Sequence, residues 1–129
     1  MSRSLSLQVL GSELAIVRLS ADAGLPWWAV GSEEFLSFTR SVSETSVVCE
    51  ADRVPEGVRA ERGYRALRVE GTLPFEAVGV LASIAVPLAH ANTPIFVIST
   101  FDTDYVLVRE AMLPAAVQAL REAGHSVTE

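Results

Sequence analysis

The stretch GVLASIAVPLAHANTPIFVISTFDTDYVLVRE, residues 79–110, carries the clearest structural pattern of the chain. Apolar side chains recur at helical spacing over residues 80–91, which predicts an amphipathic helix. Residues 94–99 form a continuous apolar run, which predicts a strand buried on both faces. Residues 100–104 have the composition of a turn, and residues 105–109 predict the next strand.

The segments on either side extend this pattern to six elements. Residues 64–70 alternate apolar and polar side chains, which predicts a strand, and residues 71–79 predict a loop. Residues 113–122 predict a second amphipathic helix, with Gly124 in the position of a C-terminal cap. Residues 125–127 are a candidate for a last short strand. The order β-α-β-β-α-β is that of an α+β, ferredoxin-like unit, in which two helices pack on one face of an antiparallel sheet.

The first half of the chain is rich in predicted strands and poor in predicted helices. Strands are expected at residues 5–10, 14–19, 35–40 and 45–50, and the first two are candidates for a hairpin. Residues 26–30 predict a short helical turn that begins with a proline.

These patterns divide the chain into two expected units. A smaller, strand-rich unit is expected over residues 1–60 and the ferredoxin-like unit over residues 61–129, with a charged linker at residues 58–63. The smaller unit is either a reduced copy of the larger one or a set of extra strands. Because a unit of about 60 residues is marginally stable alone, we expect the two to stabilise one another. Of Trp27 and Trp28, at most one is expected to lie fully in a core. Such a pair either closes the end of a small core or contacts a partner or ligand.

The composition argues against several classes of function. The formal net charge is −6, and ten basic residues are scattered among sixteen acids, which disfavours nucleic-acid and anionic-membrane binding. Apolar runs are interrupted before they reach the length of a membrane span, and no signal-peptide pattern opens the chain. The single cysteine, Cys49, can form no internal disulfide, so we expect a reducing compartment and a cytoplasmic protein.

The start of the predicted helix over residues 80–91 is one half of a candidate binding site. Gly79 lets the backbone approach a ligand closely, and the N–H groups that open a helix favour an anion such as an α-carboxylate. Ser83, one turn further on, can add a hydroxyl group. Pro87 cannot donate a hydrogen bond to the Ser83 carbonyl, which either frees that oxygen or merely accompanies a bend of the helix.

The turn at residues 100–104 is the other half of this candidate site. Asp102 and Asp104 could hold an ammonium or guanidinium group, and Phe101 could pack against an alkyl stem or a cation. Of the two acids, we favour Asp104 as the ligand contact. Alternatively, aspartate and threonine are present simply because hairpin turns prefer them.

The sequence offers no pattern for a catalytic or metal centre. His90 and His125 lack further ligands at metal-binding spacing, and the neighbours of Cys49 are mainly acids. No phosphate-binding glycine-rich loop and no nucleophile–base pair is present. We therefore expect no enzymatic activity, no cofactor and no bound metal.

A resemblance to a known family adds to this interpretation. Residues 79–84, followed by Pro87-Leu88-Ala89 and the apolar run 95–98, resemble the core of an ACT domain. The more specific motif is residues 99–110, which resembles the ACT domains of CASTOR-type arginine sensors and of short bacterial tandem-ACT proteins.

The same resemblance extends to the first half, where residues 35–40 and 43–48 look like the strand–turn–strand of an N-terminal ACT unit. It implies a non-catalytic regulatory module that binds a small molecule, commonly a free amino acid, at an interface between ACT units. The ligand-binding residues that it implies are Glu76, Gly79, Val80, Ser83, Thr100, Phe101, Asp102 and Asp104. The sensors carry two tandem pairs where this chain has one, so a homodimer would restore the missing partner surface. The alternative is a structural or protein-interaction ACT module without a working ligand site.

Overall fold

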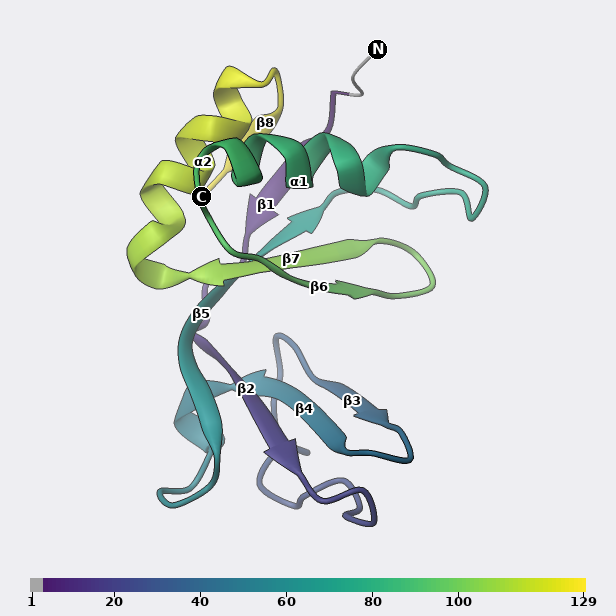
Figure 1. Cartoon of the computed structure of the whole chain (residues 1–129), viewed down its shortest axis with the longest axis vertical. Helices are drawn as coiled ribbons and strands as arrows, with labels where there is room; N and C mark the ends of the chain where they lie inside the picture. Colours follow the sequence, from purple (N-terminus) through teal and green to yellow (C-terminus); the bar gives the residue numbers. More distant parts are fainter. Residues whose placement is uncertain (1–3) are drawn as a thin grey trace. The chain divides into compact units, whose positions relative to one another are not determined.

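The computed structural model describes residues 4–129 and divides them into two compact units (Figure 1). The large unit contains residues 4–10 and 65–129, and the small unit is Gly11–Tyr64. This division differs from the expected one, because the first strand belongs with the second half of the chain. Each unit is described by itself below.

The large unit has the expected β-α-β-β-α-β order, with one further strand. Strand β5 (Ala60–Val69) enters it from the small unit, and its other elements are β1 (Ser6–Val9), α1 (Val80–His90), β6 (Phe96–Ser99), β7 (Asp104–Arg109), the 3-10 turn η2 (Glu110–Met112), α2 (Leu113–Glu122) and β8 (Ser126–Thr128). The strand order is β6-β7-β5-β1-β8. Strand β1 is antiparallel to β5 and parallel to β8, so it lies between two strands that are neighbours in the simple ferredoxin-like unit.

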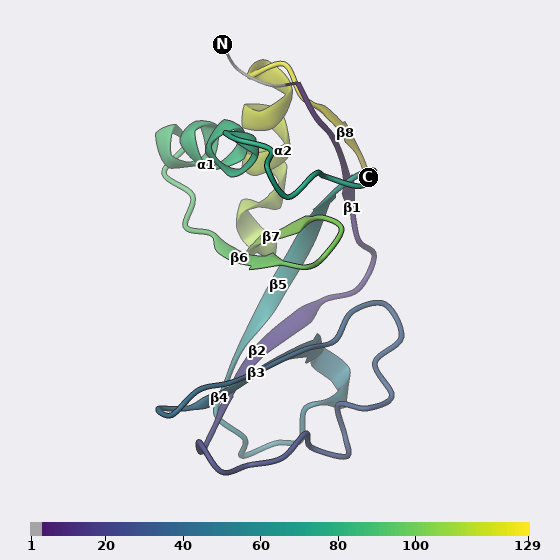
Figure 2. The ribbon, with the colours of Figure 1, turned by 90° about the vertical axis from the view of Figure 1, so that its right-hand side faces the viewer.

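Both helices cover one face of this sheet (Figure 2). Alternate residues of the central strands point toward them, as strand periodicity requires, and helical spacing supplies the opposite side of the core. The core side chains from the strands and from both helices are Leu7, Val9, Leu67, Val69, Ile84, Leu88, Val106, Val108, Leu113, Ala116, Val117, Leu120 and Val127. Burial of an aliphatic side chain contributes roughly 1.5–3 kcal/mol, so this layer is the main source of stability of the large unit.

Two expectations about strands were wrong. Residues 94–99 are not a strand buried on both faces: β6 begins at Phe96, its side chains are at most half-buried, and Ser99 is exposed. The reason is that β6 pairs only with β7 and therefore lies at the edge of the sheet. The hairpin of the first two strands does not form either, because β1 pairs with β5 and β8, whereas β2 (Leu14–Leu19) pairs with β4 and β5.

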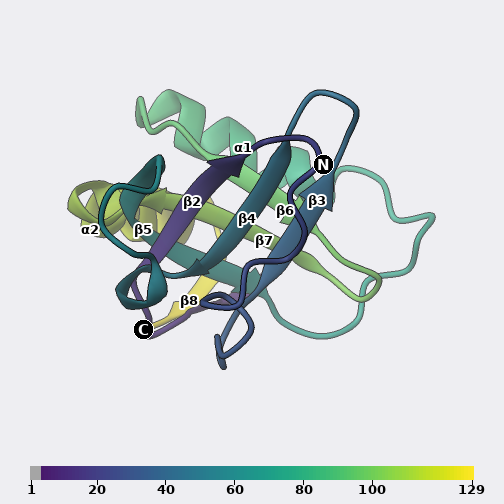
Figure 3. The ribbon, with the colours of Figure 1, turned by 90° about the horizontal axis from the view of Figure 1, so that it is seen from below.

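The small unit is an antiparallel sheet in the order β3-β4-β2-β5 (Figure 3). Strands β3 (Ser37–Arg40) and β4 (Thr45–Glu50) precede the 3-10 turn η1 (Ala51–Arg53), and the described residues of this unit contain no α-helix. The linker expected at residues 58–63 is wrong, because β5 already begins at Ala60 and pairs there with β2.

The segment at residues 26–30 forms overlapping hydrogen-bonded turns, close to the expected short helical turn, although it is not a regular helix. The Ala29 N–H donates to the Pro26 carbonyl over 3.0 Å and the Val30 N–H to the Trp27 carbonyl over 3.4 Å. Trp28 packs into the core of the small unit, while Trp27 is 83% exposed. The two tryptophans therefore separate into a buried and an exposed one, as their adjacency in the chain predicts.

Candidate functional site

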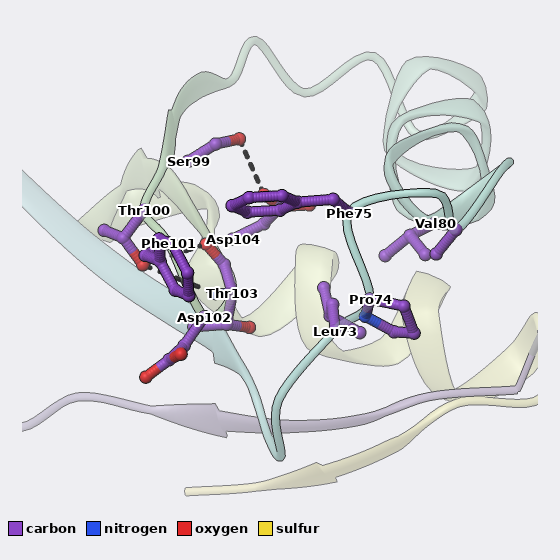
Figure 4. Close-up of a pocket in the computed structure, with 11 residues that line it drawn as sticks. Leu73, Pro74, Phe75, Val80, Ser99, Thr100, Phe101, Asp102, Thr103 and Asp104 are labelled. Atoms are coloured by element: carbon purple, nitrogen blue, oxygen red, sulfur yellow. Dashed lines mark hydrogen bonds between the residues drawn. The ribbon is translucent and has the colours of Figure 1, made fainter.

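An open pocket lies between the loop that precedes α1 and the turn that joins β6 to β7, entirely within the large unit (Figure 4). Its volume is about 240 Å³. Ligand pockets commonly measure ~300–1,000 Å³, so this one suits only a small molecule. The residues that line it are Leu73, Pro74, Phe75, Ala77, Val80, Ser99, Thr100, Phe101, Asp102, Thr103 and Asp104.

The turn that forms one wall is held by its threonines. The Thr100 N–H donates to the Thr103 carbonyl over 2.8 Å, and the Thr103 N–H donates to the Thr100 hydroxyl over 3.3 Å. Thr103 is buried, and its hydroxyl donates to the Val69 carbonyl of β5 over 2.6 Å. The turn is thus fixed both internally and to the central strand of the large unit.

The opposite wall is tied directly to this turn. The Leu73 N–H donates to the Asp102 carbonyl over 2.7 Å. Phe75 of the loop and Phe101 of the turn also meet edge-to-face, with ring centroids 4.8 Å apart and planes at 67°. Both rings are largely exposed, at 73% and 78%. The pair therefore lies at the mouth of the pocket, where a ligand beneath it could bury apolar surface (Figure 4).

The electrostatic character of the pocket comes from two carboxylates. Asp104 is half-buried, and its carboxylate accepts a hydrogen bond of 2.6 Å from the Ser99 hydroxyl, its partner across the β6–β7 register (Figure 4). Asp102 is exposed at the tip of the turn. No arginine or histidine is among the described residues that line the pocket, so its side-chain charge is negative.

Helix α1 begins at the edge of the same pocket. Gly79 is its N-cap in the left-handed conformation, with φ of 84°, and no side chain caps the helix. A Cβ at Gly79 would meet nothing within 4 Å, so the backbone angle, not crowding, is what favours glycine there. Val80, the first helical residue, is buried and lines the pocket.

Two models of known protein families match this chain. Residues 59–122 match the model of the ACT domain family. This part of the chain is an ACT domain. A second family model, described as an N-terminal domain, matches residues 12–57.

Solved structures cover nearly the whole chain. Protein Atu0741 from Agobacterium tumefaciens is 38% identical, with a TM-score of 0.91 over 98% of this chain and 93% of that one. Protein VC0802 from Vibrio cholerae, described as a possible transport protein, is 22% identical, with a TM-score of 0.75 over 94% of this chain and 91% of that one. The regulatory subunit of aspartate kinase from Thermus flavus is 12% identical, with a TM-score of 0.64 over 94% and 99%, and shares the fold.

The ACT domain brings five of the eight expected site residues to the pocket and leaves three outside its lining. Those that line it are Val80, Thr100, Phe101, Asp102 and Asp104. Glu76 is exposed in the loop, and Gly79 lies just before the lining residue Val80. The Ser83 hydroxyl donates back to the Val80 carbonyl over 2.7 Å, so it bonds within the helix.

Sequence reasoning missed several lining residues of the ACT domain. Phe75 had one available signal, an aromatic side chain beside a proline in a loop that was already suspected of binding. Leu73, Ala77 and Ser99 had none, because only the folded chain brings the loop before α1 together with the β6–β7 hairpin.

Other candidate centres lie apart from this pocket. Burial raises the pKa of the Cys49 thiol above its ordinary value, and the Ser32 side chain opposes that effect through a hydrogen bond. The thiol therefore stays protonated and unreactive in the core of the small unit. Within residues 4–129, no group of three or more potential ligands could hold a metal ion. None of the helices described is long and apolar enough to cross a membrane.

Proposed function

We propose that this protein is a non-catalytic regulatory module whose ACT domain binds a small molecule, most simply a free amino acid, in the pocket between residues 73–80 and 99–104. The observation that carries the proposal is the pairing of two carboxylates with an exposed aromatic pair around a small pocket at the start of α1. The similarity in fold to a regulatory subunit of aspartate kinase supports a regulatory role.

The two ends of an amino acid match different parts of the pocket. An ammonium group would form charge-assisted hydrogen bonds with the Asp104 carboxylate, and Asp102 would strengthen the attraction. An α-carboxylate would find donors in the first N–H groups of α1 beside Val80, which have no partners four residues earlier in the helix. The Phe75 and Phe101 rings would cover the remaining stem.

A thermal-shift panel of the twenty amino acids at millimolar concentration tests this proposal. A ligand at 100 times its Kd adds about 2.7 kcal/mol to the stability of the folded state, which corresponds to roughly 10 °C for a chain of this size. Asp104→Ala should abolish the shift, and Asp52→Ala, an exposed acid in the small unit, should leave it unchanged. A panel that shifts nothing, or a shift that Asp104→Ala leaves intact, would refute the proposed site.

A homodimer is the second part of the proposal, and the exposed apolar side chains on and before α1 support it. Leu81 and Val86 on α1 are 39% and 50% exposed, and Val78 in the preceding loop is 84% exposed. No charged side chain interrupts α1 before His90. A second copy that packs around the start of α1 would bury part of this apolar surface and add a wall beside the pocket mouth.

The homodimer is tested by light scattering during size exclusion, with and without amino acids. Leu81→Glu combined with Val86→Glu should give monomers, whereas Val42→Glu, at a 99% exposed position of the small unit, should not. A dimer that forms without ligand, together with a panel that shifts nothing, would favour the alternative function, an interaction module without a working ligand site.

Cytoplasmic location belongs to the same proposal, since the only cysteine is free.

A further inference from the structure

The middle of α1 lacks one helical hydrogen bond, and a side chain distant in the sequence supplies a replacement for it. Pro87 has no N–H group, so the Ser83 carbonyl four residues earlier has no donor within the helix. The Ser83 hydroxyl cannot fill the gap, because it donates to the Val80 carbonyl. In the structure, Nε2 of His125 lies 2.8 Å from the Ser83 carbonyl oxygen. The carbonyl that Pro87 releases is therefore not free.

The hydrogen bond to Nδ1 determines which ring nitrogen of His125 carries the proton. The Leu5 N–H lies 3.0 Å from Nδ1 of His125 and can only donate, so Nδ1 must accept. A neutral imidazole then carries its proton on Nε2, which donates to the Ser83 carbonyl. Both ring nitrogens have a defined role, and the side chain is only 5% exposed.

Backbone hydrogen bonds around His125 fix the position of its ring. Gly124 ends α2 in the left-handed conformation, with φ of 99°. The His125 N–H donates to the Leu120 carbonyl and the Gly124 N–H to the Arg121 carbonyl, each over 3.0 Å, which is the Schellman pattern of a helix end. The Ser126 N–H then donates to the Leu5 carbonyl over 2.9 Å. Leu5, just before β1, is thus held through both of its backbone groups.

We propose that His125 is a positioning residue for the pocket, one that joins the start of β1 to the turn of α1 that carries Val80. The importance of this for ligand binding rests on the proposed function. The connection runs from Leu5 through the imidazole to the Ser83 carbonyl, and from the Ser83 hydroxyl to the Val80 carbonyl. It sets where the first turn of α1 lies relative to the sheet.

Two substitutions separate the two halves of this connection. His125→Gln places an amide Nε2 near the lost ring Nε2, so the donor to Ser83 is retained and the acceptor for Leu5 is lost. His125→Asn places Oδ1 near the lost Nδ1, so the acceptor is retained and the donor is lost. In NMR spectra without ligand, the Gln variant should keep the amide shifts of residues 80–83 and exchange its Leu5 amide about tenfold faster, as expected for the loss of one hydrogen bond.

The Asn variant should show the opposite pattern, with shifted amides at residues 80–83 and a protected Leu5 amide. If the two variants perturbed residues 80–83 equally, His125 would only fill space and the proposal would be wrong. This readout needs no ligand, so its failure is distinct from an amino-acid panel that shifts nothing.

Pro87→Ala provides an independent check, because alanine restores the N–H that the Ser83 carbonyl lacks. In that background, His125→Asn should no longer shift the amides of residues 80–83, and a shift as large as in the Pro87 chain would overturn the proposal. The unaltered protein gives a test that requires no variant to fold. Its imidazole nitrogen spectrum should show the Nε2–H tautomer of His125, and the Nδ1–H tautomer would refute the connection.

Discussion

Each of the two units has a sheet with one covered face, but different elements cover it: helices in the large unit and turns in the small one. In the large unit, α1 and α2 lie on the sheet, and helical hydrogen bonds satisfy most of their backbone groups. In the small unit, the core contains Trp28, Ala29, Ala51 and Val54 from turns, and the described residues supply no α-helix. In the small unit, the Trp28 side chain covers part of the sheet face that a helix covers in the large unit.

Turns leave backbone groups without regular partners, and charged side chains of the small unit satisfy several of them. The Glu50 carboxylate accepts from the N–H groups of Glu33 and Glu34, over 2.9 and 2.7 Å. The Arg62 guanidinium donates to the carbonyls of Ala51 and Val54, over 2.9 and 3.0 Å. A unit without α-helices therefore uses long polar side chains to satisfy the backbone groups of its turns.

The largest expected effect tests the role of Trp28. Trp28→Ala should destabilise the protein by about 3–5 kcal/mol, because it removes the largest side chain from a small core and leaves a cavity. The adjacent Trp27→Ala should change stability by less than about 0.5 kcal/mol, since Trp27 is 83% exposed. Urea unfolding followed by circular dichroism measures both. Equal losses would mean that the turns, not the Trp28 side chain, hold this core.

The next effect concerns the anchored turn of the large unit. Thr103→Val removes the buried hydroxyl that donates to the Val69 carbonyl, and should cost about 1–2 kcal/mol while keeping the side-chain volume. Thr72→Val, at an exposed loop position, is the control and should be neutral. Hydrogen exchange should show faster opening of residues 99–104 in the Thr103 variant alone. Unchanged exchange there would mean that the Thr103 hydroxyl does not anchor this turn to β5.

A smaller effect is expected from the caps of the small unit. Glu50→Ala should lower the free energy of unfolding by about 1 kcal/mol, because it removes the carboxylate that accepts from two N–H groups. The loss is small because water can partly replace the carboxylate as their acceptor. Glu56→Ala, at an exposed position, is the matched control. Thermal unfolding measures the difference between the two. If both variants behaved like the unaltered protein, the Glu50 carboxylate would not stabilise the turn at residues 33–34.

The smallest effect is a dependence on alkaline pH. Burial raises the pKa of the Cys49 thiol above its ordinary value of 9.0, so the folded state holds this proton more tightly than the unfolded state. The stability due to this difference is complete below pH 9.0 and falls as the pH rises above it. Cys49→Ala should flatten that fall in denaturant midpoints measured between neutral and alkaline pH. A steeper decline in the variant would contradict the sign.

Much of the large unit could be predicted from local pattern. Residues 113–122 were expected as a helix and form α2 with the same bounds, because Leu113, Ala116, Val117 and Leu120 fall on one face at helical spacing. Gly124 was expected as its cap and adopts the left-handed conformation. The turn at residues 100–104 was a candidate for the site on its residue types together with the resemblance to ACT domains, and it does line a pocket.

Long-range pairing could not be predicted in the same way. A strand pattern shows which side chains share a face but not which strand lies beside it, so the hairpin of the first two strands was a reasonable and wrong expectation. The burial of residues 94–99 was overestimated for the same reason, since an apolar run does not reveal an edge position. Ser83 was assigned to the site for its hydroxyl, which instead bonds to Val80 within the helix.

The sequence by itself determined the helices, most strands of the large unit, the left-handed cap at Gly124 and the vacancy that Pro87 leaves at the Ser83 carbonyl. These depend on spacing and backbone chemistry within a few residues. The tertiary structure decided that β1 lies between β5 and β8, that Phe75 meets Phe101, and that His125 reaches Ser83. Those contacts join segments that are 26 residues or more apart in the chain, and local periodicity contains no information about such distant partners.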